Sequence, residues 1–256
     1  MRQSFRMGPY KMHLKKILLL LLFSLLGACS INPASKQPLS DPAFRYERVV
    51  KDDVSSPLDI WDPFESVNRA SYRFNARFDK YVYLPALSGY QYVTPDFIES
   101  GISNVFNNLD DIRTVVNQVL QLKVSETLQT STRFITNTTL GVFGLFDVAS
   151  YFGIPKHDED FGQTLGFYGV NPGPYLVIPI MGPSNLRDGV GDITDSLIVS
   201  PLLLEDHPDR KRVVYPLRFL DERAKTSFRY YQTGSPFEYE LVRLLYSTKR
   251  NIEVLK

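Results

Sequence analysis

Four adjacent ionisable residues, His157, Asp158, Glu159 and Asp160, are the densest group of side chains that could do chemistry. An imidazole and three carboxylates could bind a cation loosely, because such nitrogen and oxygen donors are common metal ligands in proteins. A charged, solvated loop explains the same residues without a ligand, and we favour this interpretation. We therefore predict no metal site.

The sequence lacks the motifs of common nucleotide-binding and hydrolytic enzymes. It contains no GxxxxGK[ST] phosphate loop, no HExxH motif and no GxSxG elbow for a nucleophilic serine. A net charge of +1 gives no strong attraction to nucleic acid. We predict a protein that is not an enzyme, uses no cofactor and binds no nucleic acid.

Covalent lipid attachment is the chemistry that the sequence supports, at the single cysteine, Cys29. Basic residues precede the apolar run 17–26, and Gly27 and Ala28 follow it, which is typical of a secretory signal peptide. The run is too short to cross a bilayer. Leu26 to Cys29 matches a bacterial lipobox; an ordinary signal peptide with a chance cysteine is the alternative.

The predicted lipobox divides the chain into three parts. Residues 1–28 form a signal peptide, residues 29–58 a lipidated flexible tether with four prolines, and residues 59–256 a helical domain. Each buried methylene contributes about 0.8 kcal/mol, so several acyl chains on Cys29 would anchor the protein firmly in a membrane.

The stretch 62–85 carries the clearest helix signals in that domain. Asp62 suits the N-cap, Pro63 the first helical position, and Glu65 can complete a capping box. A stop is expected at Leu84-Pro85, because proline disfavours a helical residue before it. The sequence thus predicts one helix that ends there.

This predicted helix has three faces at about 100° per residue. The largely aromatic face comprises Phe64, Val67, Ser71, Phe74, Phe78 and Tyr81, the cationic face Arg69, Arg73, Arg77 and Lys80, and the polar strip Asn68, Asn75 and Asp79. The segment is either a core helix with a solvated outer face or a helix at a lipid boundary, with its cations near phosphate groups.

Helical spacing continues through much of the remaining chain. We predict helices opened by Thr94-Pro95, by Asp110 or Asp111 and by Ser125, a short one that ends at Ser200-Pro201, and two more over 216–231 and after Ser235. Residues 175–181 are interrupted by Pro179, so we expect them to be extended. Residues 202–212 are predicted to form a loop. The predicted fold class is all-α.

The most apolar internal stretch is residues 140–152. Gly141 and Gly144 each weaken a helix by about 1 kcal/mol relative to alanine. The stretch is either a buried helical turn or a short hydrophobic hairpin that enters lipid. The two glycines either give it mobility that controls lipid entry at a pore mouth or are close-packing contacts.

Two groups of residues go beyond generic patterns. The first is Asp62-Pro63-x-Glu65-x-x-Asn68-Arg69, followed by Phe74-Asn75. The second begins with Phe161-Gly162-Gln163-Thr164-Leu165-Gly166 and continues through Gly173-Pro174-Tyr175 to Arg187-Asp188. In this order behind a lipobox, they resemble the MlaA (VacJ) lipoprotein family of Gram-negative outer membranes. The resemblance covers about residues 59–247.

The resemblance implies a ring-like helical bundle in the inner leaflet of the outer membrane, with a central channel. Such proteins associate with trimeric porins, take phospholipids from the outer leaflet and pass them to a soluble periplasmic carrier, which maintains lipid asymmetry. The candidate channel or motif residues are Asn68, Arg69, Phe74, Asn75, Gly141, Gly144, Arg187 and Asp188. We expect Phe74 to pack in the core, and Asn68 and Arg69 to satisfy buried polar partners or line the channel.

Two other functions compete with lipid transfer. A porin-associated structural lipoprotein without its own channel would tolerate changes at channel-facing residues. A lipid hydrolase would depend on one polar side chain, such as Ser184 or His157.

Overall fold

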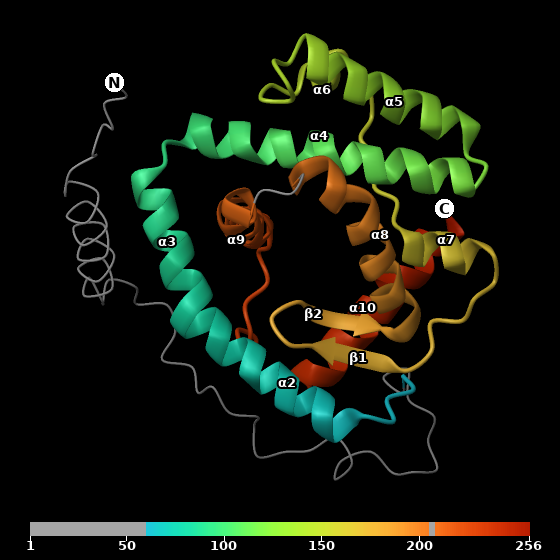
Figure 1. Cartoon of the computed structure of the whole chain (residues 1–256). Helices are drawn as coiled ribbons and strands as arrows, with labels where there is room; N and C mark the ends of the chain where they lie inside the picture. The colour runs from blue at the N-terminus through green and yellow to red at the C-terminus, as the bar shows by residue number, and fades with distance from the viewer. Residues whose placement is uncertain (1–59, 205–207) are drawn as a thin grey trace, which may run out of the picture. The chain divides into compact units, whose positions relative to one another are not determined.

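The computed structural model describes residues 60–204 and 208–256 (Figure 1). The predicted signal peptide, the tether and Cys29 lie outside the described residues. The described elements are α2 (Glu65–Phe78), η2 (Asp79–Tyr83), α3 (Leu84–Val93), α4 (Asp96–Leu120), α5 (Val124–Thr139), α6 (Val148–Tyr151), α7 (Phe161–Phe167), β1 (Tyr175–Ile178), β2 (Gly182–Asn185), α8 (Leu186–Leu204), α9 (Pro208–Lys225) and α10 (Glu238–Leu255).

The fold is mostly helical, but the all-α prediction is wrong for residues 175–185. There β1 and β2 form an antiparallel hairpin, in which Tyr175 pairs with Asn185 and Ile178 with Gly182. The expected extended conformation is confirmed for the part that forms β1. Gly182 has a φ of 95°, a left-handed conformation that glycine adopts without steric penalty and that lets the chain reverse here.

The predicted stop at Leu84-Pro85 is also wrong, because α2 continues through η2 into α3. The five residues of η2 form a π-helical turn, and the Leu84 N–H bonds to the Asp79 carbonyl, five residues back. Pro85 has no N–H and its ring would clash with a carbonyl of a regular α-helix. The wider π turn accommodates the proline without ending the helix.

Asp62 does not cap α2, whose N-cap residue is Phe64 and has no side-chain cap. The Asp62 carboxylate instead accepts hydrogen bonds from Asn68 Nδ2 at 2.7 Å, the Tyr239 hydroxyl at 2.6 Å and Arg243 Nη1 at 3.0 Å. The aspartate therefore joins the start of α2 to α10 instead of satisfying the helix end.

Other predicted boundaries shift as well. One helix, α4, replaces the two expected around Asp110 and Asp111, because both carboxylates face other helices and form ion pairs with Arg218 and Arg133. The N-cap residues of α5 and α10 are Lys123 and Phe237 in place of the predicted serines. α8 runs past Ser200-Pro201, and α9 begins within the predicted 202–212 loop and contains Pro216.

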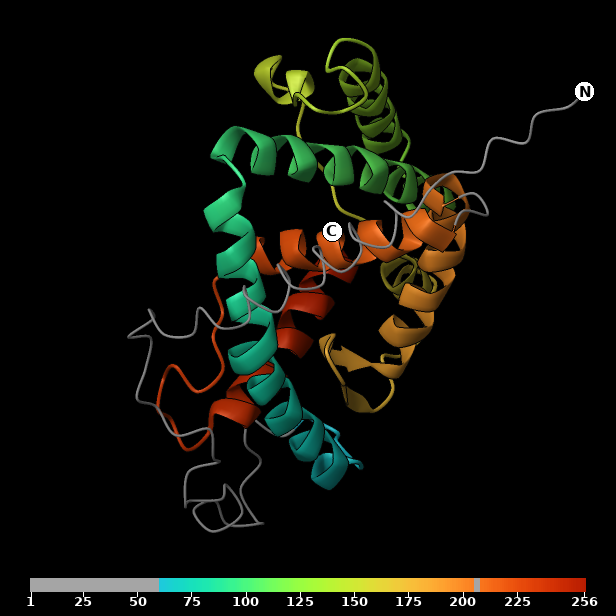
Figure 2. The same cartoon turned by 60° about the vertical axis from the view of Figure 1, so that its left-hand side comes forward.

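The hydrophobic core lies where α2, the hairpin and α10 meet. It consists of Tyr72, Ala76, Tyr175, Val177, Tyr231 and Tyr239. The Tyr72 ring makes edge-to-face contacts with Tyr231 and Tyr239, both at 5.7 Å between centroids. Such aromatic pairs contribute beyond the area that they bury. Figure 2 shows α9 running below α4, between α3 and α8.

The faces of α2 are reversed relative to the expectation that apolar residues point inward. Phe74 is 48% exposed, whereas Asn68 and Asn75 are each only 2% exposed. The prediction that Phe74 is a core residue is therefore wrong. The buried face of α2 combines Tyr72 and Ala76 with these two asparagines, whose amides hydrogen-bond the backbone of the hairpin.

Candidate functional site

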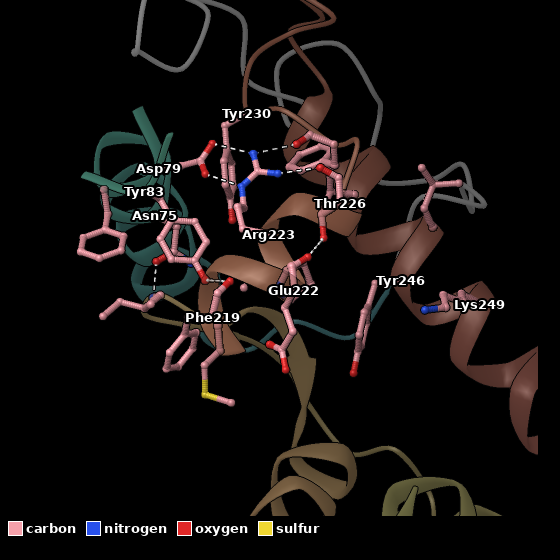
Figure 3. Close-up of a pocket in the computed structure, with 18 residues that line it drawn as sticks. Asn75, Asp79, Tyr83, Phe219, Glu222, Arg223, Thr226, Tyr230, Tyr246 and Lys249 are labelled. Carbon is pink, nitrogen blue, oxygen red and sulfur yellow. Dashed lines mark hydrogen bonds and ion pairs between the residues drawn. The ribbon is translucent and has the colours of Figure 1, made fainter. Parts of the chain in front are cut away.

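A cavity of about 550 Å³ opens between α2, η2, the hairpin, α9 and α10 (Figure 3). Its lining residues are Asn75, Phe78, Asp79, Tyr83, Ile180, Met181, Gly182, Pro183, Phe219, Glu222, Arg223, Thr226, Phe228, Tyr230, Val242, Leu245, Tyr246 and Lys249. Most of these side chains are apolar or aromatic, and a few are charged. The cavity therefore suits an amphipathic ligand.

Two asparagines of α2 position the hairpin that forms one wall of the cavity. Asn68 donates to the Tyr175 carbonyl and accepts from the Val177 N–H, both at 2.9 Å. Asn75 donates to the Ile178 carbonyl at 3.0 Å and accepts from the Ile180 N–H at 2.7 Å. Each side-chain amide thus pairs with the strand backbone as a neighbouring peptide group would.

The spacing of the two asparagines matches the repeat of the strand. Seven residues of α-helix rise about 10.5 Å. Along the hairpin, Asn68 contacts residues 175 and 177, and Asn75 contacts residues 178 and 180, which are three residues further on. Three residues of an extended strand cover about 10 Å. A helix with Asn68 and Asn75 on one face can therefore bind one strand at two successive points.

The contact between Asn75 and Ile180 stabilises an unusual turn at the cavity wall. Ile180 has a φ of 70°, which is rare for a β-branched residue. The hydrogen bond from its N–H to Asn75 helps to fix this conformation. Ile180 and Met181 then border the cavity.

The buried charges of the cavity wall form a bidentate ion pair between η2 and α9. Arg223 Nε lies 2.6 Å from Asp79 Oδ1, and Nη2 lies 2.9 Å from Oδ2. The same guanidinium donates to the carbonyls of Thr226 and Phe228. These contacts satisfy most of its donors, so the pair links two helices and brings no net charge to the cavity.

Two tyrosines beside this pair keep neutral hydroxyls. Burial, with a further contribution from Glu222, raises the pKa of Tyr83 to about 12. Burial and the charge of Asp79 raise the pKa of Tyr230 to about 12. The Tyr83 hydroxyl donates to the Phe219 carbonyl at 2.7 Å.

Of the predicted site residues, Asn75 is the one that lines the cavity. Asn68 has buried polar partners, one of its two expected roles. Arg69 joins α2 to α10: it binds Glu65 and Glu240 and lies 4.3 Å above the Tyr239 ring. It therefore serves the packing of the two helices.

Arg187 and Asp188 are buried at the start of α8, outside the cavity lining. The Asp188 carboxylate accepts from Arg250 Nε at 2.7 Å, Tyr246 at 2.8 Å and Asn185 at 2.6 Å. Burial opposes ionisation, but the hydrogen bond and charge of Arg250 outweigh it and lower the pKa of Asp188. The aspartate thus holds the hairpin, α8 and α10 together as an anion.

The apolar stretch 140–152 is exposed, so the expectation of a buried helical turn is wrong. Phe143, for example, is 79% exposed. A Cβ atom at Gly141 would lie 2.2 Å from the Phe146 carbonyl oxygen, and one at Gly144, whose φ is 87°, would lie 2.8 Å from the Asn108 side chain. Both glycines are therefore close-packing positions that fix the loop, which favours that alternative over a hinge.

The run 157–160 does not converge on one point. His157 contacts Gln129, Asp158 pairs with Arg113, Glu159 with Lys123, and Asp160 with Arg250. Within residues 60–204 and 208–256, no group of three or more His, Cys, Asp or Glu side chains could hold a metal ion. In the same part of the chain, no helix has the length and hydropathy needed to cross a membrane.

The sequence analysis missed most of the cavity. Asp79 was visible only as part of the polar strip of the helix predicted over 62–85, and its partner Arg223 comes 144 residues later. Glu222, Tyr246 and Lys249 carried no local signal. The sequence signal that could have identified this pair is that Asp79 lies on the same face as Asn68 and Asn75. A carboxylate that is buried with such amides requires a cationic partner.

Comparisons with known proteins agree with one another. The sequence profile of the MlaA lipoprotein family matches residues 60–253. A Rickettsia felis protein is 40% identical over 152 residues, 59% of this chain and 61% of its own length. The intermembrane phospholipid transport system lipoprotein MlaA of Shigella flexneri is 38% identical over 141 residues, 53% of this chain and 56% of its own. These matches span less than two thirds of either relative.

The fold has a solved counterpart, from work on the structural basis for maintenance of bacterial outer membrane lipid asymmetry. That structure superposes with a TM-score of 0.63 at 28% sequence identity. The match covers 75% of this chain and 98% of the solved chain.

Proposed function

Because this chain belongs to the MlaA lipoprotein family, we propose that it is an outer-membrane lipoprotein that transports phospholipids between membranes. It removes them from the outer leaflet of the outer membrane and passes them to a soluble periplasmic carrier, without catalysis or a cofactor. Relatives named as phospholipid transport lipoproteins support the handling of phospholipid. The direction of transport and the carrier are part of the proposal.

The cavity is the observation that carries this function. A phospholipid needs an apolar surface for its chains and polar groups for its phosphate. The lining offers apolar side chains such as Phe78, Met181 and Leu245 beside the charged side chains of Glu222 and Lys249. We propose that the helices form a ring in the inner leaflet and that this cavity is part of its central channel.

Exposed apolar side chains support the placement in a leaflet. Phe97 and Tyr92 near the start of α4, Leu128 and Ile135 on α5, and the loop residue Phe143 are all exposed. Large exposed apolar surfaces mark contacts with membranes or other proteins. A lipid on Cys29 would anchor the protein with the domain facing the periplasm, and trimeric porins are the proposed membrane partners.

Filling the cavity tests the function. Leu245 lines the cavity on α10, and Leu245→Trp should block it. We expect outer-leaflet phospholipid to rise in cells to at least half the level seen without the protein, because a bulky ring occupies the path. The measurement is surface-accessible phospholipid, alongside the membrane level and melting temperature of the variant.

Leu241→Trp is the matched control, because Leu241 is exposed on the same helix and is not part of the cavity lining. It should leave surface phospholipid at the wild-type level. If a well-folded Leu245→Trp protein also behaves like wild type, the cavity is not the lipid path. The protein would then act as a porin-associated structural lipoprotein without its own channel.

A further inference from the structure

The charges of the cavity differ in how available they are to a ligand. The Asp79–Arg223 pair is buried, and four hydrogen bonds occupy the guanidinium. Glu222 and Lys249, by contrast, have side chains that are 56% and 72% exposed and border the cavity. An entering headgroup therefore meets one exposed carboxylate and one exposed ammonium group, from α9 and α10 respectively.

Among residues 60–204 and 208–256, both exposed charges pair with neighbours on their own helices. Glu222 Oε1 accepts from Arg218 Nε at 3.1 Å, and Lys249 Nζ lies 3.5 Å from Glu253 Oε1, each one helical turn away. Such exposed pairs contribute about 0–1 kcal/mol, so a ligand can replace them at little cost. In Figure 3, Tyr246 lies between the two side chains.

From this arrangement we infer that the cavity selects zwitterionic phospholipids whose headgroup ends in a primary ammonium group. This inference rests on the proposed transport of phospholipid. Lys249 binds the phosphate, and Glu222 accepts hydrogen bonds from the ammonium. The apolar side chains of Phe78, Met181 and Leu245 contact the chains.

The same two residues disfavour other headgroups. An anionic lipid that ends in hydroxyl groups can use Lys249, but it has no ammonium group to offer Glu222, whose carboxylate then keeps only its pairing with Arg218. A quaternary ammonium keeps the charge balance but has no N–H to donate to the carboxylate. Specificity is this difference in free energy between ligands.

The test is capture of lipid by a photo-crosslinking residue at position 245 in the full-length lipidated protein. The protein is reconstituted in vesicles with equal amounts of phosphatidylethanolamine, phosphatidylglycerol and phosphatidylcholine, and the captured lipids are quantified by mass spectrometry. We expect phosphatidylethanolamine to exceed phosphatidylglycerol by about fivefold, the ratio that roughly 1 kcal/mol gives at one exposed contact.

Glu222→Gln should bring this ratio close to one while total capture persists, and Glu222→Lys should reverse it toward phosphatidylglycerol. The matched control is Glu99→Gln, at a half-buried glutamate of α4 outside the cavity lining, which should keep the wild-type ratio. Melting temperatures verify that each variant folds.

The two proposals fail in different ways. Capture with a ratio near one in the wild type, or a ratio unchanged by Glu222→Gln, overturns the headgroup inference and leaves the lipid path intact. Capture at position 245 no greater than at position 241 for every lipid overturns the proposed path and the inference with it.

Discussion

The core around Tyr72 and the α4–α5 pair are held together by opposite kinds of interaction. At the first, tyrosine rings, Ala76 and Val177 are buried between α2, the hairpin and α10. On the two helices of the second, the buried side chains are mostly polar or charged: Asn108, Asp111, Thr114, Asn117 and Gln118 on α4, and Thr130, Arg133 and Asn137 on α5. Across the pair, Asn108 donates to Thr138 and Arg133 lies 4.0 Å from Asp111, whereas Asn117 bonds to α7 and α8. Apolar residues of α5 such as Leu128 and Ile135 are exposed instead.

This difference matches what a domain in contact with both water and lipid would require. A core of tyrosines gains its stability from removing apolar surface from water. Helices that associate in lipid gain nothing from hiding apolar side chains, and use small residues and hydrogen bonds between helices. The α4–α5 pair follows the second pattern, which supports its proposed place in the leaflet.

Arg133 is the residue on which the polar region depends most. It is 2% exposed and donates to the Ile154 carbonyl at 2.6 Å, Ser150 Oγ at 3.1 Å and both oxygens of Asp147 at 3.0 Å. Its Nε lies 4.0 Å from Asp111. One side chain thus joins α4, α5 and the loop that carries the exposed apolar residues.

Arg133→Met, which breaks this network, should cause the largest decrease in the free energy of unfolding. Arg133→Met leaves the buried Asp111 carboxylate without its cation, and removing one partner of a buried ion pair costs about 3–5 kcal/mol. Hydrogen exchange should show residues 140–154 opening first, while β1 keeps its protection. Both global stability and local exchange should be measured in the same detergent.

Arg77→Met is the control, because Arg77 is an exposed arginine of α2. It should change the free energy of unfolding by no more than about 0.5 kcal/mol. If Arg133→Met is equally mild, hydrogen bonding does not hold α4 and α5 together.

The protonation of Asp111 should make the free energy of unfolding depend on pH, by a smaller amount of about 2–3 kcal/mol. Burial raises its pKa to about 6, although the charge of Arg133 opposes the shift. The folded protein therefore holds this proton where the unfolded chain, with a pKa near 3.9, has lost it. This contribution to stability is full below about pH 4 and is lost as pH rises through about 6.

Urea unfolding of wild type and Asp111→Asn at pH 4.5 and 7.5 measures this contribution. The variant should lose less stability than wild type over that interval. Asp192 also has a pKa of about 6, raised by burial, but it is present in both proteins and cancels in the difference. Equal losses in the two proteins would show that Asp111 does not titrate as the geometry indicates.

The comparison also explains what could be predicted from the sequence. The helices themselves were predictable, because α2, α4, α5 and α10 show clear periodicity. Which face is buried was not, because the rule that apolar faces turn inward assumes water outside the protein. Phe74, Leu128 and Ile135 break that rule, whereas Tyr72 follows it.

The candidate site was less predictable than the fold. The polar strip did place Asn68 and Asn75 on one face of α2, and buried amides need partners wherever they lie. It could not identify β1 as that partner, about a hundred residues later. Arg223 and Lys249 reach the cavity only through the packing of α9 and α10, which no local pattern encodes.

Phe74→Ala should cause the smallest loss in the free energy of unfolding, and Tyr72→Ala on the same helix is the comparison. Tyr72 is 1% exposed, and its removal should cost about 3–5 kcal/mol, as large-to-small core changes do. Phe74 is half-exposed and stacks on Phe78 at 6.1 Å between centroids. Its removal should cost only about 1 kcal/mol, roughly half of what burying a phenylalanine contributes.

The two substitutions decide which face of α2 is the inner one. Both remove an aromatic ring from positions two residues apart, so helix propensity changes similarly and cannot produce a large difference. Urea unfolding in one detergent gives the stabilities. Flotation with phospholipid vesicles of protein that lacks the N-terminal lipid should then be weaker for Phe74→Ala than for a Tyr72→Phe control, since an exposed ring contacts lipid. Equal destabilisation by Phe74→Ala and Tyr72→Ala would mean that the aromatic face is buried after all, and that the polar strip faces outward.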